Sequence, residues 1–296
     1  MSRSVERGNR ITKACRFLGI ARSTYYHAQH KTDAAQEDEH KAALIRQIHE
    51  TSFFTFGRRR IGEVLEAATG LKLGESQLGR LMRQFDLQAR IRQPRRPGNG
   101  YRGGKPSGLP GNILNRQFHA EHPGERFLTD VTYVRYYEQQ EWHWGYLSVV
   151  LDLFDRSVVA WVYSKQQDLK LALNTLKVLS FKEVRQGAIL HSDHGSMYTS
   201  HAFRDELKRL GIQQSLSRVG NCHDNAPMES FNGTLKVEGL RNPAFGIHAT
   251  PSFLEQNQAI ERYIEFYNHQ RPSSILKNKT PMAFRGRYYD QLAAAN

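Results

Sequence analysis

A basic stretch rich in proline and glycine divides this chain of 296 residues into two parts of different character. Residues 90–110 read RIRQPRRPGNGYRGGKPSGLP, a composition that does not pack into a hydrophobic core. Before this stretch the apolar residues recur at helical spacing, and after it strand-like and helical segments alternate. The stretch therefore predicts a domain boundary, and we place a basic linker over residues 92–111.

The N-terminal part begins with a pattern that is typical of a small helix-turn-helix. Residues 9–27 place apolar side chains at helical spacing before Gly19, which supplies a turn into a second helix. This pattern predicts a helix-turn-helix-like segment over residues 1–30, and a two-helix scaffold without DNA contacts is the alternative. Residues 29–37 are polar, and we expect a linker there.

Residues 38–91 predict a second helical unit, a DNA-binding domain with arginines on the polar side of amphipathic helices. A solvated arginine face is the alternative interpretation, but the recurrence of arginines at helical spacing favours contact with grooves and phosphates. The arginines of the basic linker can also follow a phosphate backbone. The residues expected to contact DNA here are Arg58, Arg59, Arg60, Arg80, Arg83, Arg92, Arg95 and Arg96.

The excess positive charge of the chain lies in its first third. The formal net charge is +13, and residues 1–110 contain 21 Lys and Arg against 10 Asp and Glu. Residues 111–296 contain 21 Lys and Arg against 19 Asp and Glu. A basic segment joined to a near-neutral one indicates a polyanion-binding module joined to a second function.

From residue 112 to about residue 290 the pattern predicts an α/β domain. Three strand-like segments come first, and a helix, a strand, a helix, a strand and a helix follow. This order predicts a mixed sheet flanked by helices. The fold class expected for the whole chain is therefore α/β, with small all-α helix-turn-helix units in front.

Three acidic residues occupy suggestive positions in this second part. Asp130 lies on the first predicted strand, Asp193 ends the fourth, and Glu229 lies near the start of a helix. An acid within an apolar strand is costly unless it has a partner. Each acid alone could instead cap a turn or face solvent, so the argument depends on their joint occurrence.

A divalent cation is a partner that several carboxylates can share. Two Asp and one Glu suit Mg²⁺ or Mn²⁺, which bind oxygen and keep room for water and phosphate. Two such ions about 3.5–4 Å apart would clamp an in-line displacement at phosphorus, one activating the nucleophile and the other stabilising the leaving oxygen. We therefore predict that these acids are catalytic and hold two ions per active site.

Neighbouring residues extend this constellation. Lys236 follows Glu229 by seven residues, about two helical turns, so both side chains are expected on one face. This spacing predicts a phosphate-binding cation beside a metal ligand, with an ordinary solvated Glu and Lys as the alternative. His191 and His194 flank Asp193 and could contact phosphate or water, or could make only local hydrogen bonds.

The composition disfavours several other classes of protein. Cys15 and Cys222 are too few for a disulfide framework or a cysteine-rich zinc site. Neither the G-x-S-x-G motif of hydrolases nor the G-x-x-x-x-G-K-[ST] loop of ATP-binding proteins occurs. No apolar run approaches the roughly 20 residues of a membrane helix. The first ten residues, MSRSVERGNR, show no apolar signal region behind their charges, so we do not expect secretion. We expect a cytoplasmic protein.

With these residues in place, the chain resembles, over residues 10–286, the second-reading-frame (OrfB) products of bacterial copy-out, paste-in insertion sequences. Thirty-five residues separate Asp193 from Glu229, which is the spacing characteristic of that family, and a basic residue follows seven positions later. The matching stretches are LTDVTYV at 128–134, YLSVVLDLFDRSVVAW at 146–161, HSDHGSMYTS at 191–200, DNAPMESFNGTLK at 224–236 and YNHQRP at 267–272.

The resemblance implies a DDE transposase whose catalytic core is of the retroviral-integrase and ribonuclease-H type. Asp130, Asp193 and Glu229 would take the catalytic positions, and Lys236 the DNA-contacting one. Such a Mg²⁺-dependent polynucleotidyl transferase would cut insertion-sequence ends and join the 3′-hydroxyl to DNA, which is the recombination and integration chemistry of transposition.

The resemblance also implies partners. These would be double-stranded DNA, in the form of terminal inverted repeats and target DNA, and further copies of this chain in a dimer or higher homo-oligomer. A bacterial, nucleoid-associated location follows, and no membrane contact is expected. The family's active enzyme is usually a frameshift fusion with a leucine-zipper part, whose heptads are missing here, so a separate first-frame product is a further candidate partner.

Two positions depart from the family pattern, and two other functions stay open. Phe127 stands where a Trp is common, which indicates a packing change, and Ser273 stands where a His is frequent. A DNA-binding regulator without strand-transfer activity would use the basic helical units alone. A ribonuclease-H-like nuclease on RNA–DNA hybrids would share the sheet, although the N-terminal helical units favour duplex DNA.

Overall fold

The computed structural model describes residues 11–90, 109–218, 221–245 and 248–295. It separates into two compact units, residues 1–89 and 90–296. The predicted linker lies largely outside the described residues, and so do Arg92, Arg95 and Arg96.

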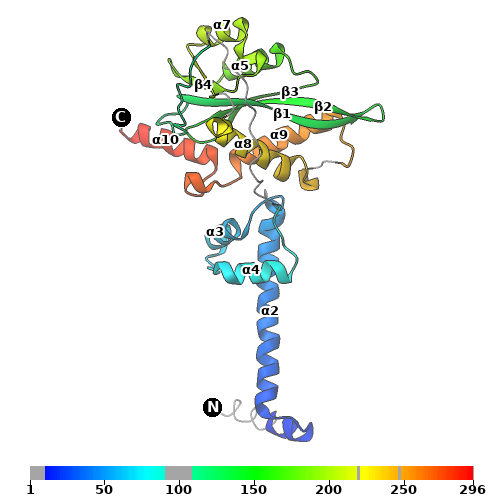
Figure 1. The fold of residues 1–296 in the computed structure, drawn as a ribbon. Helices are drawn as coiled ribbons and strands as arrows, with labels where there is room; N and C mark the ends of the chain where they lie inside the picture. The colour runs from blue at the N-terminus through cyan, green and yellow to red at the C-terminus, as the bar shows by residue number, and fades with distance from the viewer. Residues whose placement is uncertain (1–10, 91–108, 219–220, 246–247, 296) are drawn as a thin grey trace. The chain divides into compact units, whose positions relative to one another are not determined.

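The N-terminal unit is entirely helical. Residues 11–17 form a helix, and a turn at Gly19, whose φ is +66°, leads to α2. Helices α3 and α4 follow, and both pack on α2 (Figure 1). Their bounds are α2 Arg22–Thr51, α3 Arg58–Thr69 and α4 Glu75–Gln84. Their shared core is formed by Ala42, Ile45, Ile61, Leu65, Leu78 and Leu81.

The linker expected over residues 29–37 is not there. Helix α2 continues through these residues without a break, so this prediction is wrong. The segment is polar but contains no Gly or Pro, and Ala, Gln, Glu and Lys all have good helix propensity. Polarity by itself therefore does not distinguish a polar helix from a break in the helix.

The C-terminal unit is built on a five-stranded mixed sheet in the order β3-β2-β1-β4-β5. The first three strands form an antiparallel meander, whereas β4 pairs in parallel with both β1 and β5. The strands are β1 Arg126–Glu138, β2 Glu141–Asp152, β3 Val158–Ser164, β4 Ile189–Ser192 and β5 Gln213–Leu216. The predicted order of strands and helices is thus confirmed.

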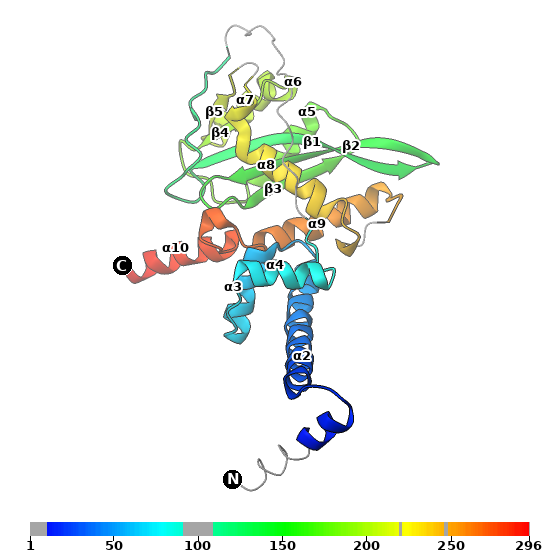
Figure 2. The ribbon, with the colours of Figure 1, turned by 60° about the horizontal axis from the view of Figure 1, so that its bottom comes forward.

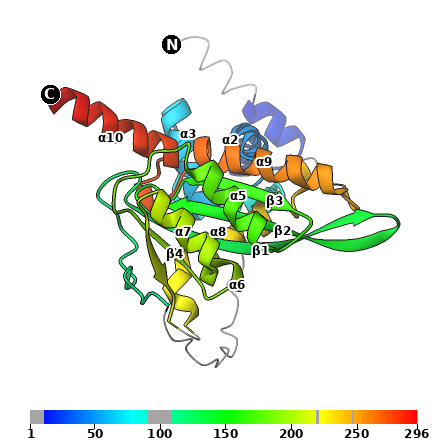
Figure 3. The ribbon, with the colours of Figure 1, turned by 90° about the horizontal axis from the view of Figure 1, so that it is seen from above.

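Helices cover both faces of this sheet. Figure 1 shows α5 and α7 on one face, and α8, α9 and α10 on the other. Viewed from above in Figure 3, the tip of the β1–β2 hairpin reaches beyond the helices. The bounds are α5 Leu169–Leu179, α6 Ser196–Thr199, α7 His201–Arg209, α8 Ala226–Thr234, α9 Phe253–His269 and α10 Pro281–Ala295.

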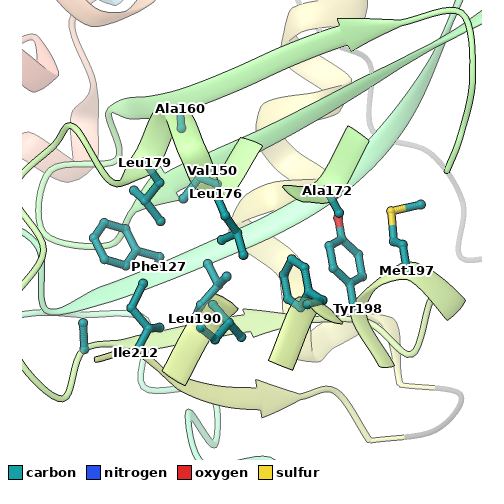
Figure 4. Close-up of a cluster of buried hydrophobic side chains, with 13 residues drawn as sticks. Phe127, Val150, Ala160, Ala172, Leu176, Leu179, Leu190, Met197, Tyr198 and Ile212 are labelled. Carbon is teal, nitrogen blue, oxygen red and sulfur yellow. The ribbon is translucent and has the colours of Figure 1, made fainter. Parts of the chain in front are cut away.

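The main core lies between the sheet and helices α5 and α7. Phe127, from β1, is fully buried in it, and Leu176, Leu179 and Leu190 belong to the same cluster (Figure 4). Phe127 therefore has a packing role in the core of this unit. This core holds the start of β1 and β4 in place; Asp130 lies further along β1, and Asp193 directly follows β4.

Helix α10 is tied to the sheet by buried charge. The Arg285 guanidinium donates to Asp152 Oδ2 at 2.7 Å and to Asp155 Oδ2 at 2.6 Å. Both carboxylates are fully buried, and burial, with the neighbouring Asp155 charge, raises the pKa of Asp152 to about 6. The two acids of the LDLFDRS turn thus have a structural role.

Candidate active site

The register of β1 and β4 brings two of the predicted acids together. Leu128 of β1 pairs with His191 of β4 in a parallel ladder. Two residues further along come Asp130, which shares a face of β1 with Leu128 because side chains alternate with a period of two, and Asp193, which directly follows the last residue of β4. The parallel pairing of β1 with β4 therefore brings both acids into one region of the unit.

The electrostatics of Asp130 connect all three acids. Burial, followed by the negative charges of Asp193 and Glu229, raises the pKa of the Asp130 carboxyl to about 7. The Lys236 ammonium acts in the opposite direction. Three acidic side chains from β1, the β4 end and α8 thus share one electrostatic environment, in which a bound cation would favour the charged carboxylate.

The third acid and the lysine lie on α8 and on the turn that follows it. Figure 2 shows α8 lying across the sheet, and α8 contacts β1. Glu229 lies in the first turn of α8, but the α-helix ends at Thr234, and Leu235–Gly239 forms a π-helical turn. The continuous α-helix assumed in the spacing argument is therefore wrong at Lys236, although the Lys236 charge still acts on Asp130.

Asn232 also belongs to the candidate site, although no sequence motif pointed to it. Its amide Nδ2 donates to Asp130 Oδ2 at 2.9 Å, and its side chain is almost fully buried. Asn232 follows Glu229 by three residues, so both lie on one side of α8. The three-residue spacing from Glu229 is the signal that could have identified Asn232. An uncharged amide, however, is not by itself a sign of a metal site.

Asp193 is held by the turn that follows β4. The backbone N–H of Gly195 donates to Asp193 Oδ1 at 2.8 Å, which orients the carboxylate at the start of α6. The Asp193 side chain is otherwise exposed. Behind it, Tyr198 is buried, and burial together with the nearby Asp130 carboxylate raises the pKa of the Tyr198 phenol well above its usual value.

The segment before α8 is fixed by Asp224. This fully buried carboxylate accepts hydrogen bonds from the guanidinium groups of Arg218 and Arg116 and from the amide of Asn112. The Arg218 hydrogen bond holds the pKa of the Asp224 carboxyl well below its usual range. Asp224 therefore anchors the entry to α8, and no side chain caps that helix at Asn225.

The two histidines beside Asp193 have different environments. His191 is fully buried, with Nδ1 2.8 Å from Ser215 Oγ and Nε2 3.0 Å from Ser217 Oγ. Burial lowers the pKa of His191 to about 4, so this ring is neutral at pH 7 and links β4 to β5. His194 donates from Nε2 to the Ser217 carbonyl oxygen at 2.6 Å. Both histidines thus make the local hydrogen bonds that were one of the two alternatives.

The carboxylates are not arranged as a ready-made metal cage. Within the described residues, no group of three His, Cys, Asp or Glu side chains is spaced to hold a metal ion. The donor chemistry nevertheless fits a hard cation, because three carboxylates influence one another and burial disfavours the charge of Asp130.

Four of the predicted DNA-contacting arginines of the N-terminal unit are exposed and some of them are paired with acids, whereas Arg60 is half-buried, with its guanidinium 5.9 Å from the Phe56 ring centroid. The Arg59 Nε–Glu75 Oε1 distance is 2.9 Å, and Arg58 lies near the same carboxylate. Arg80 makes two hydrogen bonds to the Asp38 carboxylate, at 2.7 and 2.9 Å. Arg83 is exposed and donates to the Gly79 carbonyl oxygen of its own helix.

Known domain families match most of the chain. The integrase core domain matches residues 120–222, a second integrase core domain family matches residues 210–281, and the HTH-like domain matches residues 35–95. The first two matches include the three acids, and the third includes α3 and α4.

Similar proteins of insertion sequences cover nearly the whole chain. A 31 kDa protein of insertion element IS600 from Shigella sonnei is 34% identical over 95% of this chain and 100% of its own length. The transposase of insertion sequence IS904 from Lactococcus lactis is 36% identical over 77% of this chain and 87% of its own. The transposase InsF of IS3A from Escherichia coli is 31% identical over 79% and 81%, respectively.

Among solved structures, the catalytic core domain of HTLV-2 integrase in complex with magnesium superposes with a TM-score of 0.44. The two chains are 18% identical, and the match covers 56% of this chain and 98% of that one. Within the described residues, no helix is long and apolar enough to cross a membrane. The extent of the sequence matches and the integrase core place this chain among the insertion-sequence DNA transposases, polynucleotidyl transferases of the DDE type.

Proposed function

We propose that Asp130, Asp193 and Glu229 are the catalytic acids of this transposase and that they hold divalent metal ions, Mg²⁺ or Mn²⁺, two per active site. The observation that carries the proposal is the raised pKa of Asp130, which two carboxylates from separate elements help to produce. When bound, the ions would supply Lewis-acid activation of the nucleophile and stabilisation of the leaving oxygen.

The remaining residues of the site bind and orient. The Lys236 ammonium is positioned to attract a DNA phosphate to the acids, which it already influences. Asn232 holds the Asp130 carboxylate from α8, and the Gly195 N–H holds that of Asp193. The three carboxylates must move closer together to share the ions. Rotation about the terminal bonds of their side chains would allow this movement.

We further propose that the DNA substrates are the terminal inverted repeats of the insertion sequence and a target duplex. The arginines Arg58, Arg59, Arg60, Arg80 and Arg83 would contact phosphates, and the basic linker with Arg92, Arg95 and Arg96 would add to them. Because two ends must be joined, the active form would contain at least two copies of the chain, with a first-frame product as a further partner.

The experiment uses the full chain, duplex DNA spanning an end of the insertion sequence that carries its gene, and Mg²⁺ or Mn²⁺. We expect the wild-type chain to nick and join the DNA, and Asp193→Asn to lose both steps while DNA affinity stays within about twofold. Asp205→Asn on α7 is the matched control, because Asp205 is exposed and, within the described residues, its ion pair is with the equally exposed Lys208. Full activity in Asp193→Asn would refute the assignment, and wild-type binding without nicking would indicate a regulator.

A further inference from the structure

The far end of the β1–β2 hairpin carries a ladder of aromatic side chains around one arginine. In the antiparallel register Arg135 pairs with Trp144, Tyr137 with Trp142 and Tyr133 with Tyr146. Because paired residues and residues two apart share a face of a sheet, all six side chains lie on one face. The ladder consists of Tyr133, Arg135, Tyr137, Trp142, Trp144 and Tyr146.

This ladder is open to solvent. The exposed fractions are 47% for Tyr133, 43% for Trp142 and 54% for Trp144, so two of the three tryptophans of the chain are surface residues. The Arg135 guanidinium lies 4.4 Å from the Trp142 ring centroid and 5.8 Å from that of Trp144. A cluster of exposed aromatic rings around a cation is typical of a binding surface.

The ladder forms one wall of a groove of about 670 Å³. The opposite wall comes from the π-helical turn and the segment before α9, and it contributes Lys236, Arg241 and His248. Four basic side chains, including Arg135, thus line the groove, and within the described residues no Asp or Glu does. This combination of basic groups and aromatic rings is complementary to a nucleic-acid strand.

Lys236 connects this groove to the acids. It lines the groove, and it lies in the π-helical turn directly after α8, the helix that carries Glu229 and the Asn232 amide bonded to Asp130. A DNA strand whose phosphate contacts Lys236 would therefore continue from the acids toward Trp142 and Trp144. Only unpaired bases can present a free face to these rings, because bases within a duplex are already stacked on their neighbours.

We propose that this groove binds unpaired nucleotides of DNA next to the phosphodiester bond at which the enzyme acts. The bases stack on Trp142, Trp144 and the Arg135 plane, and the backbone is held by Lys236 and Arg241. The inference rests on the proposed function for its location and goes beyond it in assigning a separate site for single-stranded DNA.

The test compares two DNA probes in the Asp193→Asn background, in which no cleavage complicates binding. One probe is a blunt duplex, and the other is the same duplex with a short unpaired extension. We expect the full chain to bind the extended duplex more tightly by about 5- to 150-fold for each stacked base, with quenching of tryptophan fluorescence. The double variant Trp142→Ala/Trp144→Ala should lose this preference and bind the blunt duplex as before.

Two further variants separate stacking from general damage to the fold. Trp142→Phe/Trp144→Phe keeps aromatic faces and should retain part of the preference. Phe181→Ala removes an aromatic ring that is 79% exposed on another part of the surface, and it should change nothing.

A preference that survives in the double alanine variant would overturn the proposal. A change in oligomeric state with the preference intact would also overturn it, because the ladder would then be a protein interface. If the wild-type chain prefers the extended duplex but does not carry out strand transfer, only the proposed function is contradicted. Failure of the proposed function is therefore distinguishable from failure of this proposal.

Discussion

Asn232 shows how an uncharged residue can control a carboxylate in this site. Its buried side-chain amide donates a hydrogen bond to Asp130 Oδ2 at 2.9 Å. The orientation of the Asp130 carboxylate therefore depends on α8 and not only on β1. Residues that hold a metal ligand in place commonly affect metal affinity or activity by about 10–100-fold. Asn232 is therefore a positioning residue for the predicted catalytic acid.

Replacing Asn232 by Ala should raise the Mn²⁺ concentration needed for half-maximal strand transfer by about 10–100-fold. The reason is that the Asp130 carboxylate loses its orienting donor. A metal titration of activity measures this effect, and Thr234→Ala, whose hydroxyl bonds only to the Ser230 carbonyl oxygen of the same helix, is the control. A lower maximal rate with an unchanged metal requirement would contradict the role.

Asp224 stabilises the fold in a pH-dependent way. Its pKa is lowered from 3.8 in the folded protein, chiefly by the Arg218 hydrogen bond, so the folded state binds fewer protons than the unfolded state below that pH. The stabilisation is therefore complete above the unfolded pKa and is lost as the pH falls through the folded one. The Asp224 carboxylate links Arg218, which follows β5, with Asn112 and Arg116, which precede β1, and it does so at the entry to α8.

Asp224→Asn should lower the free energy of unfolding by about 2 kcal/mol at pH 7, since charge-assisted hydrogen bonds are lost while both arginines stay partly hydrated. The difference from the wild type should shrink as the pH falls below 3.8, the usual pKa of an Asp carboxyl. Urea unfolding at several pH values measures it, and the exposed Asp205→Asn should show no such trend. A difference that does not depend on pH would disprove the ionic origin.

Among the strands, the middle of β2 is where packing tolerates least change. A Cβ atom at Gly145 would overlap the ring and hydroxyl of Tyr163 on β3. Tyr163 is itself stacked on Phe253 at the start of α9, with ring centroids 4.5 Å apart and planes at 9°. The glycine thus allows β2, β3 and α9 to meet at one point, close to the base of the aromatic ladder.

Gly145→Ala should therefore lower the free energy of unfolding by about 1–3 kcal/mol, because the added methyl group displaces a well-packed ring. Gly286→Ala is the matched control: a Cβ there meets nothing within 4 Å, and replacing a helical glycine by alanine should stabilise the chain by about 0.5–1 kcal/mol. Thermal unfolding compares the two, and an equal effect of both substitutions would contradict the packing argument.

The helix that carries Glu229 changes character at its end. The α-helix gives way to a π-helical turn at Leu235–Gly239, and the buried Glu238 of this turn is bonded by Arg271 at 2.6 and 2.8 Å. Gly239 lies against the Tyr263 ring of α9, where a Cβ would come within 2.7 Å. The tight contact with α9 and the ion pair favour the wider turn, which also sets the position of Lys236.

Considered as a whole, the molecule joins a basic helical unit to a near-neutral α/β unit that contains the candidate active site. This division of charge suggests that the helical unit and the basic stretch after it supply much of the attraction to DNA. The acids and the groove then act on the strand that has been bound. The affinity for DNA and the rate of strand transfer by the bound enzyme should therefore depend differently on salt concentration.

Binding of the full chain to duplex DNA should weaken by about 10³–10⁵-fold between 50 and 200 mM salt if roughly 6–10 phosphates are contacted. Arg83→Gln should reduce the slope of log affinity against log salt by about 1, since this exposed guanidinium bonds only to a backbone carbonyl oxygen of its own helix. Fluorescence anisotropy at a series of salt concentrations measures both. A flat response would show that the basic part does not contact the DNA backbone.

Much of this organisation was predictable from the sequence. The predictable features are the order of strands and helices, the division into two parts, and the positions of Asp130, Asp193 and Glu229 on or next to their elements. Alternation, helical periodicity and turn residues are local properties, and an acid in an apolar strand is conspicuous for the same reason. The resemblance added the family, which the matched domains confirm. The continuity of α2 was missed because a polar helix and a polar linker differ little in composition.

Contacts between distant segments followed only from the folded chain. Several contacts bring together residues that are far apart in sequence. They are the Asn232–Asp130 hydrogen bond, the ion pairs of Arg285 that hold α10, the contact of the π-helical turn with α9, and the groove shared by the hairpin ladder and Lys236. No local pattern encodes such a contact, because its energy arises from burial and from geometry that exists only when the sheet and its helices have packed.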